Sequence, residues 1–189
     1  MGNALTTFLN LFGNIAGDEE QVVAATEQRV YKEGDVLLKE GSVAKELFFV
    51  VSGVLKITSV NEKGNDVTYF FLKENQFCTI LTSFNDRVPA KEGIVAACDT
   101  EVLAIRKNKL LQLYEQLPYM KTLIDSIIQR RLLDKIENSN AYMGKDAATR
   151  YQLFMMREPD IALRVPLSDV ASYLGITPQS LSRIRKNIR

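Results

Sequence analysis

The chain has 189 residues, of which 46% are hydrophobic and 25% charged, and its formal net charge is +1. This is the composition of an ordinary globular protein of one or two domains, and its charge gives no general attraction for nucleic acid, so nucleic-acid binding would require a local basic cluster. The sequence has no histidine and two cysteines, Cys78 and Cys98, which excludes histidine-ligated zinc or haem, Ser-His-Asp catalysis and a four-thiolate iron–sulfur cluster.

Two short helices are predicted first. Apolar residues at helical spacing indicate one over residues 4–16, and a second follows over about 18–26. Asp18 can cap this second helix, and Glu19 and Glu20 suit its positive end.

From about Gln28 to Arg106 the hydrophobic period changes to two, and glycines separate the apolar runs. The clearest predicted strands are 47–51, 54–58 and 67–71, with turns at Ser52-Gly53 and 61–65. Short strands joined by such turns predict a small sandwich or barrel.

A long helix is predicted over residues 119–138, directly after Pro118. Apolar residues recur on it three and four positions apart: Met120, Leu123, Ile124, Ile127, Ile128, Leu132 and Ile136. The residues alone leave two interpretations open, a dimer interface with coiled-coil-like pairing or a helix packed in the core of its own chain.

A domain boundary is placed at Gly144, after a polar stretch at 138–140. Asp146 is then expected to cap a helix that runs to about Arg157 and is ended by Glu158-Pro159.

The segment 165–189 has the features of a helix-turn-helix. One face of a short first helix is apolar, Gly175 permits the left-handed turn that ends it, and Thr177 and Pro178 begin the second helix. The expected inner residues are Leu167, Val170, Ala171, Leu174, Ile176, Leu181, Ile184 and Ile188.

The outer face of the second helix is the candidate DNA-binding site. From Thr177 to the end the sequence has four basic residues and no acidic one. Arginine and glutamine suit bidentate readout of guanine and adenine, and serine and lysine suit phosphate oxygens. The assigned residues are Thr177, Gln179, Ser180, Ser182, Arg183, Lys186 and Arg189. The alternative is a solvated basic helix without a nucleic-acid partner.

Nearly the whole chain resembles the Crp/Fnr family of bacterial transcription regulators. The segment 32–56 is similar to the opening of that family's cyclic-nucleotide-type β-roll, the long helix to its dimer helix, and 146–151 to the first helix of its DNA-binding domain. The resemblance implies an α+β fold with N-terminal helices and a β-roll sensor at 1–107, a dimerisation region at 108–142 and a helix-turn-helix domain at 143–189. It places Gln179 and Arg183 at base-reading positions.

The resemblance also implies which residues serve the other functions. Thr177, Ser180 and Lys186 fall near the family's phosphate contacts. The dimer interface is assigned to Met120, Leu123, Ile124, Ile127, Ile128 and Leu132. The effector pocket is assigned to Phe77, Thr79, Ile80, Ser83, Arg87 and Lys91.

Two departures from the family pattern stand out. Cyclic AMP sensors carry a Gly-Glu pair for the ribose and an Arg-Ser or Arg-Thr pair for the phosphate, whereas the aligned positions here are Thr79-Ile80 and Ala90-Lys91. Because both charged anchors are missing, we expect a divergent branch that does not bind cyclic AMP. The family's small β-wing would follow Arg189, so the chain is either wingless or truncated.

Two functions remain in competition. One is a homodimeric regulator that binds an inverted-repeat operator in double-stranded DNA, acts with RNA polymerase and has an unknown effector. The other is a small-molecule binding module whose basic helix is incidental. The sequence shows no nucleophile motif or P-loop, so no enzyme, catalytic residue, metal or cofactor is expected. It also lacks a membrane-spanning run and a signal peptide pattern, so a cytoplasmic location is expected.

Overall fold

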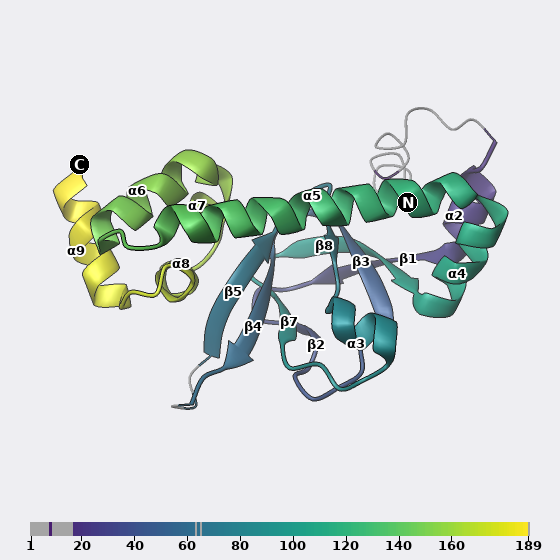
Figure 1. Cartoon of the computed structure of the whole chain (residues 1–189), viewed down its shortest axis with the longest axis horizontal. Helices are drawn as coiled ribbons and strands as arrows, with labels where there is room; N and C mark the ends of the chain where they lie inside the picture. The colour runs from purple at the N-terminus through teal and green to yellow at the C-terminus, as the bar shows by residue number, and fades with distance from the viewer. Residues whose placement is uncertain (1–7, 9–16, 63, 65, 189) are drawn as a thin grey trace.

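The computed structural model describes residues 8, 17–62, 64 and 66–188. A β-roll lies beneath one long helix, α5, and a group of short helices is attached at one end of that helix (Figure 1). The predicted helix over 4–16 lies outside the described residues except for Phe8, whose ring is buried against Phe49 and Phe77 with centroids 4.9 and 6.1 Å away.

The described part of the β-roll consists of two four-stranded antiparallel sheets, with strand orders β1-β8-β3-β6 and β2-β7-β4-β5. The strands are β1 Thr26–Tyr31, β2 Val36–Leu38, β3 Glu46–Ser52, β4 Leu55–Val60, β5 Asp66–Leu72, β6 Phe77–Cys78, β7 Gly93–Ala96 and β8 Thr100–Arg106. The predicted strands and the turn at Gly53 are confirmed. Gly53 has φ 93°, and a Cβ there would lie 2.4 Å from the carbonyl oxygen of Asp99, so the turn requires glycine.

Three short helices flank the β-roll: α2 Glu19–Ala25, α3 Leu81–Asp86 and α4 Lys107–Gln116. The expected capping role of Asp18 is wrong, because its side chain makes no capping hydrogen bond to α2. Its carboxylate instead accepts a hydrogen bond from the Tyr119 hydroxyl at 2.7 Å. Desolvation and this carboxylate raise the pKa of Tyr119 to about 12, so the contact joins α2 to α5.

Helix α5, Pro118–Tyr142, is longer than predicted, and its faces differ in environment. Met120 and Ile124 are completely buried in the core that the chain itself forms, and Leu123, Ile127 and Ile128 pack partly buried against that core. The assignment of Met120 and Ile124 to a dimer interface is therefore corrected, because residues of the β-roll and of α4 already cover both side chains. Leu132 and Ile136 are 42% and 56% exposed.

The C-terminal helical unit consists of α6 Ala147–Arg157, α7 Pro159–Arg164, α8 Leu167–Tyr173 and α9 Pro178–Ile188. The cap at Asp146 is confirmed, because its carboxylate accepts a hydrogen bond from the Thr149 backbone N–H at 2.8 Å. Helix α7 was not predicted. A second apolar core joins this unit to the β-roll, because Phe154, Ala171 and Leu181 share it with Val54 and Phe71.

Candidate functional site

Helices α8 and α9 form the predicted helix-turn-helix. Gly175 has φ 66°, and its N–H and that of Ile176 donate to the carbonyl oxygens of Ser172 and Ala171 at 3.0 and 2.9 Å. This pair of hydrogen bonds is a Schellman ending of α8. The Thr177 hydroxyl then accepts the Ser180 backbone N–H at 3.1 Å and so caps α9. The turn is fixed by local hydrogen bonds.

The inner faces of both helices are apolar, as the sequence predicted. Val170, Ala171, Leu174 and Leu181 are buried, and Leu167, Ile176 and Ile184 pack partly buried against them. Small Ala171 permits the two helices to cross closely. The side chain of Ile188 lies outside the described residues. Since the inner face is occupied by the core, the polar residues of α9 are directed outward.

The predicted DNA-contacting residues fall into two groups. Those exposed on the surface are Thr177, Gln179, Ser182, Arg183 and Lys186. Ser180 is half-buried, and its hydroxyl accepts a hydrogen bond from the Thr177 hydroxyl at 3.0 Å. Arg189 lies outside the described residues. Sequence reasoning did not assign Arg185, which is also exposed and adds a further positive charge.

Helix α8 rests directly on strand β5 of the β-roll. The Thr68 backbone N–H donates to the Ser172 hydroxyl at 2.9 Å, and the Lys56 ammonium lies 2.7 Å from the Asp169 carboxylate. The side chains of Lys56 and Asp169 are 18% and 13% exposed, so water screens this pair only in part. These contacts join residues more than 100 positions apart, and no pattern in the sequence indicates them.

The β-roll holds a small cavity of about 70 Å³ beneath α5, with Phe77 and Thr79 among its lining residues. The Thr79 hydroxyl donates to the Glu46 carbonyl oxygen at 2.9 Å and is therefore already engaged. Arg131 of α5 covers the cavity, with its guanidinium 4.7 Å from the centroid of the Phe70 ring and 3.1 Å from Glu158. Sequence reasoning did not identify Arg131.

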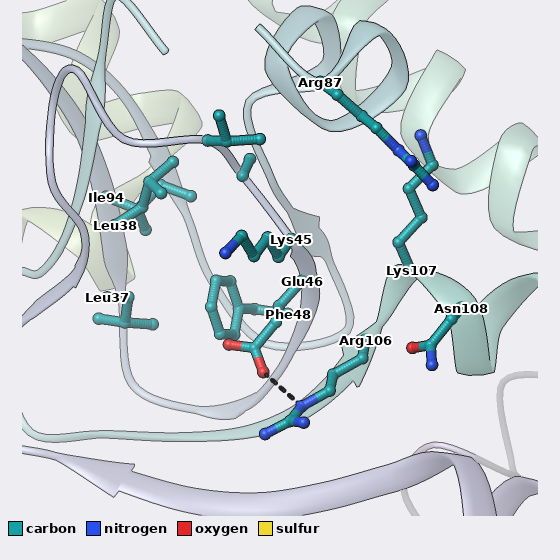
Figure 2. Close-up of a pocket in the computed structure, with 12 residues that line it drawn as sticks. Leu37, Leu38, Lys45, Glu46, Phe48, Arg87, Ile94, Arg106, Lys107 and Asn108 are labelled. Atoms are coloured by element: carbon teal, nitrogen blue, oxygen red, sulfur yellow. Dashed lines mark ion pairs between the residues drawn. The ribbon is translucent and has the colours of Figure 1, made fainter. Parts of the chain in front are cut away.

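The structure separates the six residues assigned to an effector pocket. Ile80 is buried, and the buried Ser83 hydroxyl accepts the Ala44 backbone N–H at 2.8 Å and donates to the Val88 carbonyl oxygen. Lys91 is exposed. Arg87 lines a different and larger cavity, which Figure 2 shows. The six residues therefore do not surround one pocket.

Both cysteine thiols are free, and burial raises the pKa of Cys78 far above its usual range. Within the described part of the chain, no cluster of three or more Cys, Asp or Glu side chains is arranged to hold a metal ion. The helices described there include none with the length and apolar character needed to cross a membrane.

Comparison with known proteins extends these observations. The cyclic nucleotide-binding domain family matches residues 28–117. The cyclic AMP receptor protein of Thermus thermophilus is 22% identical over 179 residues, which is 92% of this chain and 82% of the relative.

Two solved structures share the fold. The c-di-GMP-responsive global regulator CLP of Xanthomonas campestris superposes with a TM-score of 0.72 at 18% identity, over 92% of this chain and 91% of the other. FixK2 of Bradyrhizobium japonicum superposes with a TM-score of 0.73 at 16% identity, over 86% and 84% of the two chains. The chain therefore contains a cyclic nucleotide-binding domain and is homologous and structurally similar to the transcription regulators of the Crp/Fnr family.

Proposed function

We propose that this protein is a sequence-specific DNA-binding transcription regulator. The observation that carries the proposal is the outer face of α9, where exposed Gln179, Arg183 and Lys186 lie on a helix without an acidic residue. A helix of this kind can enter the major groove while its partner helix crosses the backbone. Double-stranded DNA and RNA polymerase are then the partners, and the cytoplasm is the place of action.

Within this face, the position of each residue suggests its role. Arg183 follows Gln179 by four residues, so the two share one side of the helix. An arginine there can make a bidentate contact with guanine, worth about 1–3 kcal/mol of discrimination between bases. Lys186 lies nearer the helix C-terminus, where a phosphate contact would position the helix without reading sequence.

The second half of α5 supports a homodimer. Leu133 and Ile136 are 61% and 56% exposed, and with Ser126, Gln129 and Asn140 they recur at alternating spacings of three and four. This is the spacing of a coiled-coil seam. A parallel pair would present two α9 helices to half-sites about 34 Å apart, so the operator is expected to be an inverted repeat.

Cyclic AMP is not the effector in this proposal. The β-roll cavity of about 70 Å³ is well below the roughly 300–1,000 Å³ of ordinary ligand sites. The aligned anchor positions carry buried Thr79, Ile80 and Ala90, which offer neither a carboxylate for a ribose nor a guanidinium for a phosphate. Calorimetry with cyclic AMP is expected to show no saturable binding below about 1 mM, and a micromolar constant would contradict this part of the proposal.

Fluorescence anisotropy with labelled genomic fragments at several salt concentrations tests the function. The wild type is expected to bind with a steep salt dependence, because cationic side chains displace counterions from phosphates. Lys186→Ala should lower the slope of log K against log salt by about one unit per subunit, whereas Lys39→Ala, an exposed lysine of the β-roll, should leave it unchanged. Absence of DNA binding by the wild type would favour the small-molecule module instead.

A further inference from the structure

A cavity of about 690 Å³ lies on the side of the β-roll where β2, the start of β3 and the junction of β8 with α4 meet. It takes no part in the DNA-reading function proposed above. Its volume falls within the range of ordinary small-molecule sites, roughly 300–1,000 Å³. The small cavity beneath α5 measures only about 70 Å³, so of these two cavities the larger one has the space for a ligand.

One wall of this cavity is apolar. Leu37 and Leu38 of β2, Phe48 of β3 and Ile94 of β7 line it. In Figure 2, Leu37, Leu38 and Ile94 gather on one side of the space, with Phe48 beside them. Phe48 and Ile94 are buried and support this wall from behind, and half-buried Leu37 and Leu38 form the surface that the apolar body of a ligand could contact.

The opposite wall is cationic. Arg87, Arg106 and Lys107 lie across the space from the leucines, and Lys45 projects from the start of β3 between the two walls (Figure 2). Lys107 is held in place, because its ammonium donates to the carbonyl oxygens of Phe84 and Asn85 at 2.5 and 2.9 Å.

The single acid among the lining residues does not neutralise this wall. Both oxygens of Glu46 accept hydrogen bonds from Arg29 at 2.9 Å, and Arg106 lies farther from the same carboxylate, at 3.7 Å. Four cationic side chains therefore face one carboxylate that already has a partner. Charge-assisted hydrogen bonds to an anion are stronger next to an apolar wall than in open water.

From this polarity we infer that the cavity binds an organic anion with an apolar body, such as an aromatic carboxylate. The apolar body would lie against Leu37 and Leu38, and the positive charges of Lys45 and Arg87 would attract the anionic group. The ligand class follows from the chemistry of the two walls. A neutral apolar molecule would bring no negative charge to the cationic side chains. A small inorganic anion would leave the apolar wall in contact with water.

Calorimetry of the whole protein with three probes tests this inference. The probes are 2-naphthoate, its neutral isostere 2-naphthamide, and acetate, which has the charge without the apolar body. We expect 2-naphthoate to saturate one site per chain with Kd below about 1 mM, and the other two to bind at least about tenfold more weakly. The inference is overturned if binding of 2-naphthoate does not saturate, or if 2-naphthamide binds as tightly as 2-naphthoate.

Matched variants locate the site. Lys45 and Arg87 are exposed, so Lys45→Gln and Arg87→Gln should leave thermal unfolding unchanged, and together they should raise the Kd for 2-naphthoate at least about tenfold. Lys91→Gln removes the same charge from an exposed residue outside the cavity lining and should have no effect. If the Lys91 variant and the double variant lost the same affinity for 2-naphthoate, the assignment of the binding site to this cavity would be overturned. The readout is ligand binding by the protein alone, so it is independent of DNA binding.

Discussion

The two ends of the molecule carry their functional groups in different ways. At the helical end, the side chains proposed to contact DNA lie on one short helix, α9, whose start and inner face are set by neighbours in the sequence. At the β-roll end, the walls of the large cavity come from segments spread between residues 37 and 108. A site on one helix depends on local periodicity and capping, whereas a cavity depends on how distant strands pair.

Helix α5 connects the two ends, and its two sides have different surroundings. Met120 and Ile124 lie in the core, whereas Leu133 and Ile136 are exposed. Because nine residues make about two and a half helical turns, Leu133 lies on the side of α5 opposite Ile124, so the helix packs one face within its own chain and leaves the other face uncovered.

The largest effect is expected from Ile124→Asp. This side chain is completely buried, so an unpaired carboxylate there should destabilise the fold by more than about 3 kcal/mol. Leu111→Asp on α4 is the control, because Leu111 is an exposed leucine. Urea unfolding followed by circular dichroism measures both variants. Equal stability of the two would show that the first half of α5 is not part of the core.

A loss of dimers without loss of the fold is expected from the double variant Leu133→Asp, Ile136→Asp. Two like charges at facing positions of a coiled-coil seam repel each other and forgo the apolar contact. Sedimentation at about 10 µM should show wild-type dimers and variant monomers, with native circular dichroism for both. A wild-type monomer at this concentration, or a variant that remains dimeric, would contradict the proposed interface.

A moderate loss of stability is expected when the contact between α8 and the β-roll is weakened. Asp169→Ala leaves the largely buried Lys56 without its carboxylate and should cost about 1–2 kcal/mol. Hydrogen exchange should then increase at Thr68, whose N–H donates to Ser172 of α8. Asp125→Ala is the matched control, because it breaks an exposed pair with Lys121 on α5, which is worth less than about 0.5 kcal/mol. Unchanged exchange at Thr68 would show that the pair does not hold the ends together.

A small, pH-dependent effect is expected at the start of α6. The Thr149 backbone N–H, which donates to the Asp146 carboxylate, lowers the pKa of this group. Its contribution to stability is therefore present above the pKa of the unfolded chain and is lost as pH falls through the lower, folded value. Asp146→Ala should lower the melting temperature slightly at neutral pH, and the difference from wild type should vanish in acid. A constant difference at all pH values would exclude the charged cap.

Local features were predictable from the sequence. The cap at Asp146, the left-handed Gly175 and the Thr177 cap of α9 all depend on residues within a few positions. The prediction that Asp18 caps a helix was wrong, because its carboxylate accepts a hydrogen bond from Tyr119, 101 residues away. Helices α3 and α7, with six residues each, are too short for a period of 3.6 to be recognised.

The pockets could not be predicted in the same way. Of the residues assigned to an effector pocket, Arg87 alone lines the large cavity, where it is joined by Leu37 and Arg106. Leu37 and Arg106 are brought to the cavity because β2 pairs with β7 and β3 pairs with β8. Arg87 comes directly after α3 and two residues before the bridge between Val43 and Pro89. Pairing between distant segments leaves no short-range signal. The helical period of α5 likewise predicted an apolar face, but the covering of that face by the β-roll could be learned only from the fold.

We infer that α9 reads DNA sequence through Arg183. Selection of bound fragments from a random DNA pool with the wild type, Arg183→Ala and Lys39→Ala tests this role. We expect the wild type and the Lys39 variant to select the same inverted repeat with half-sites one helical turn apart. Arg183→Ala should lose preference at one base pair in each half-site, equivalent to about 1–3 kcal/mol. An unchanged motif in the Arg183 variant, or no motif in the wild type, would show that Arg183 does not read the DNA sequence.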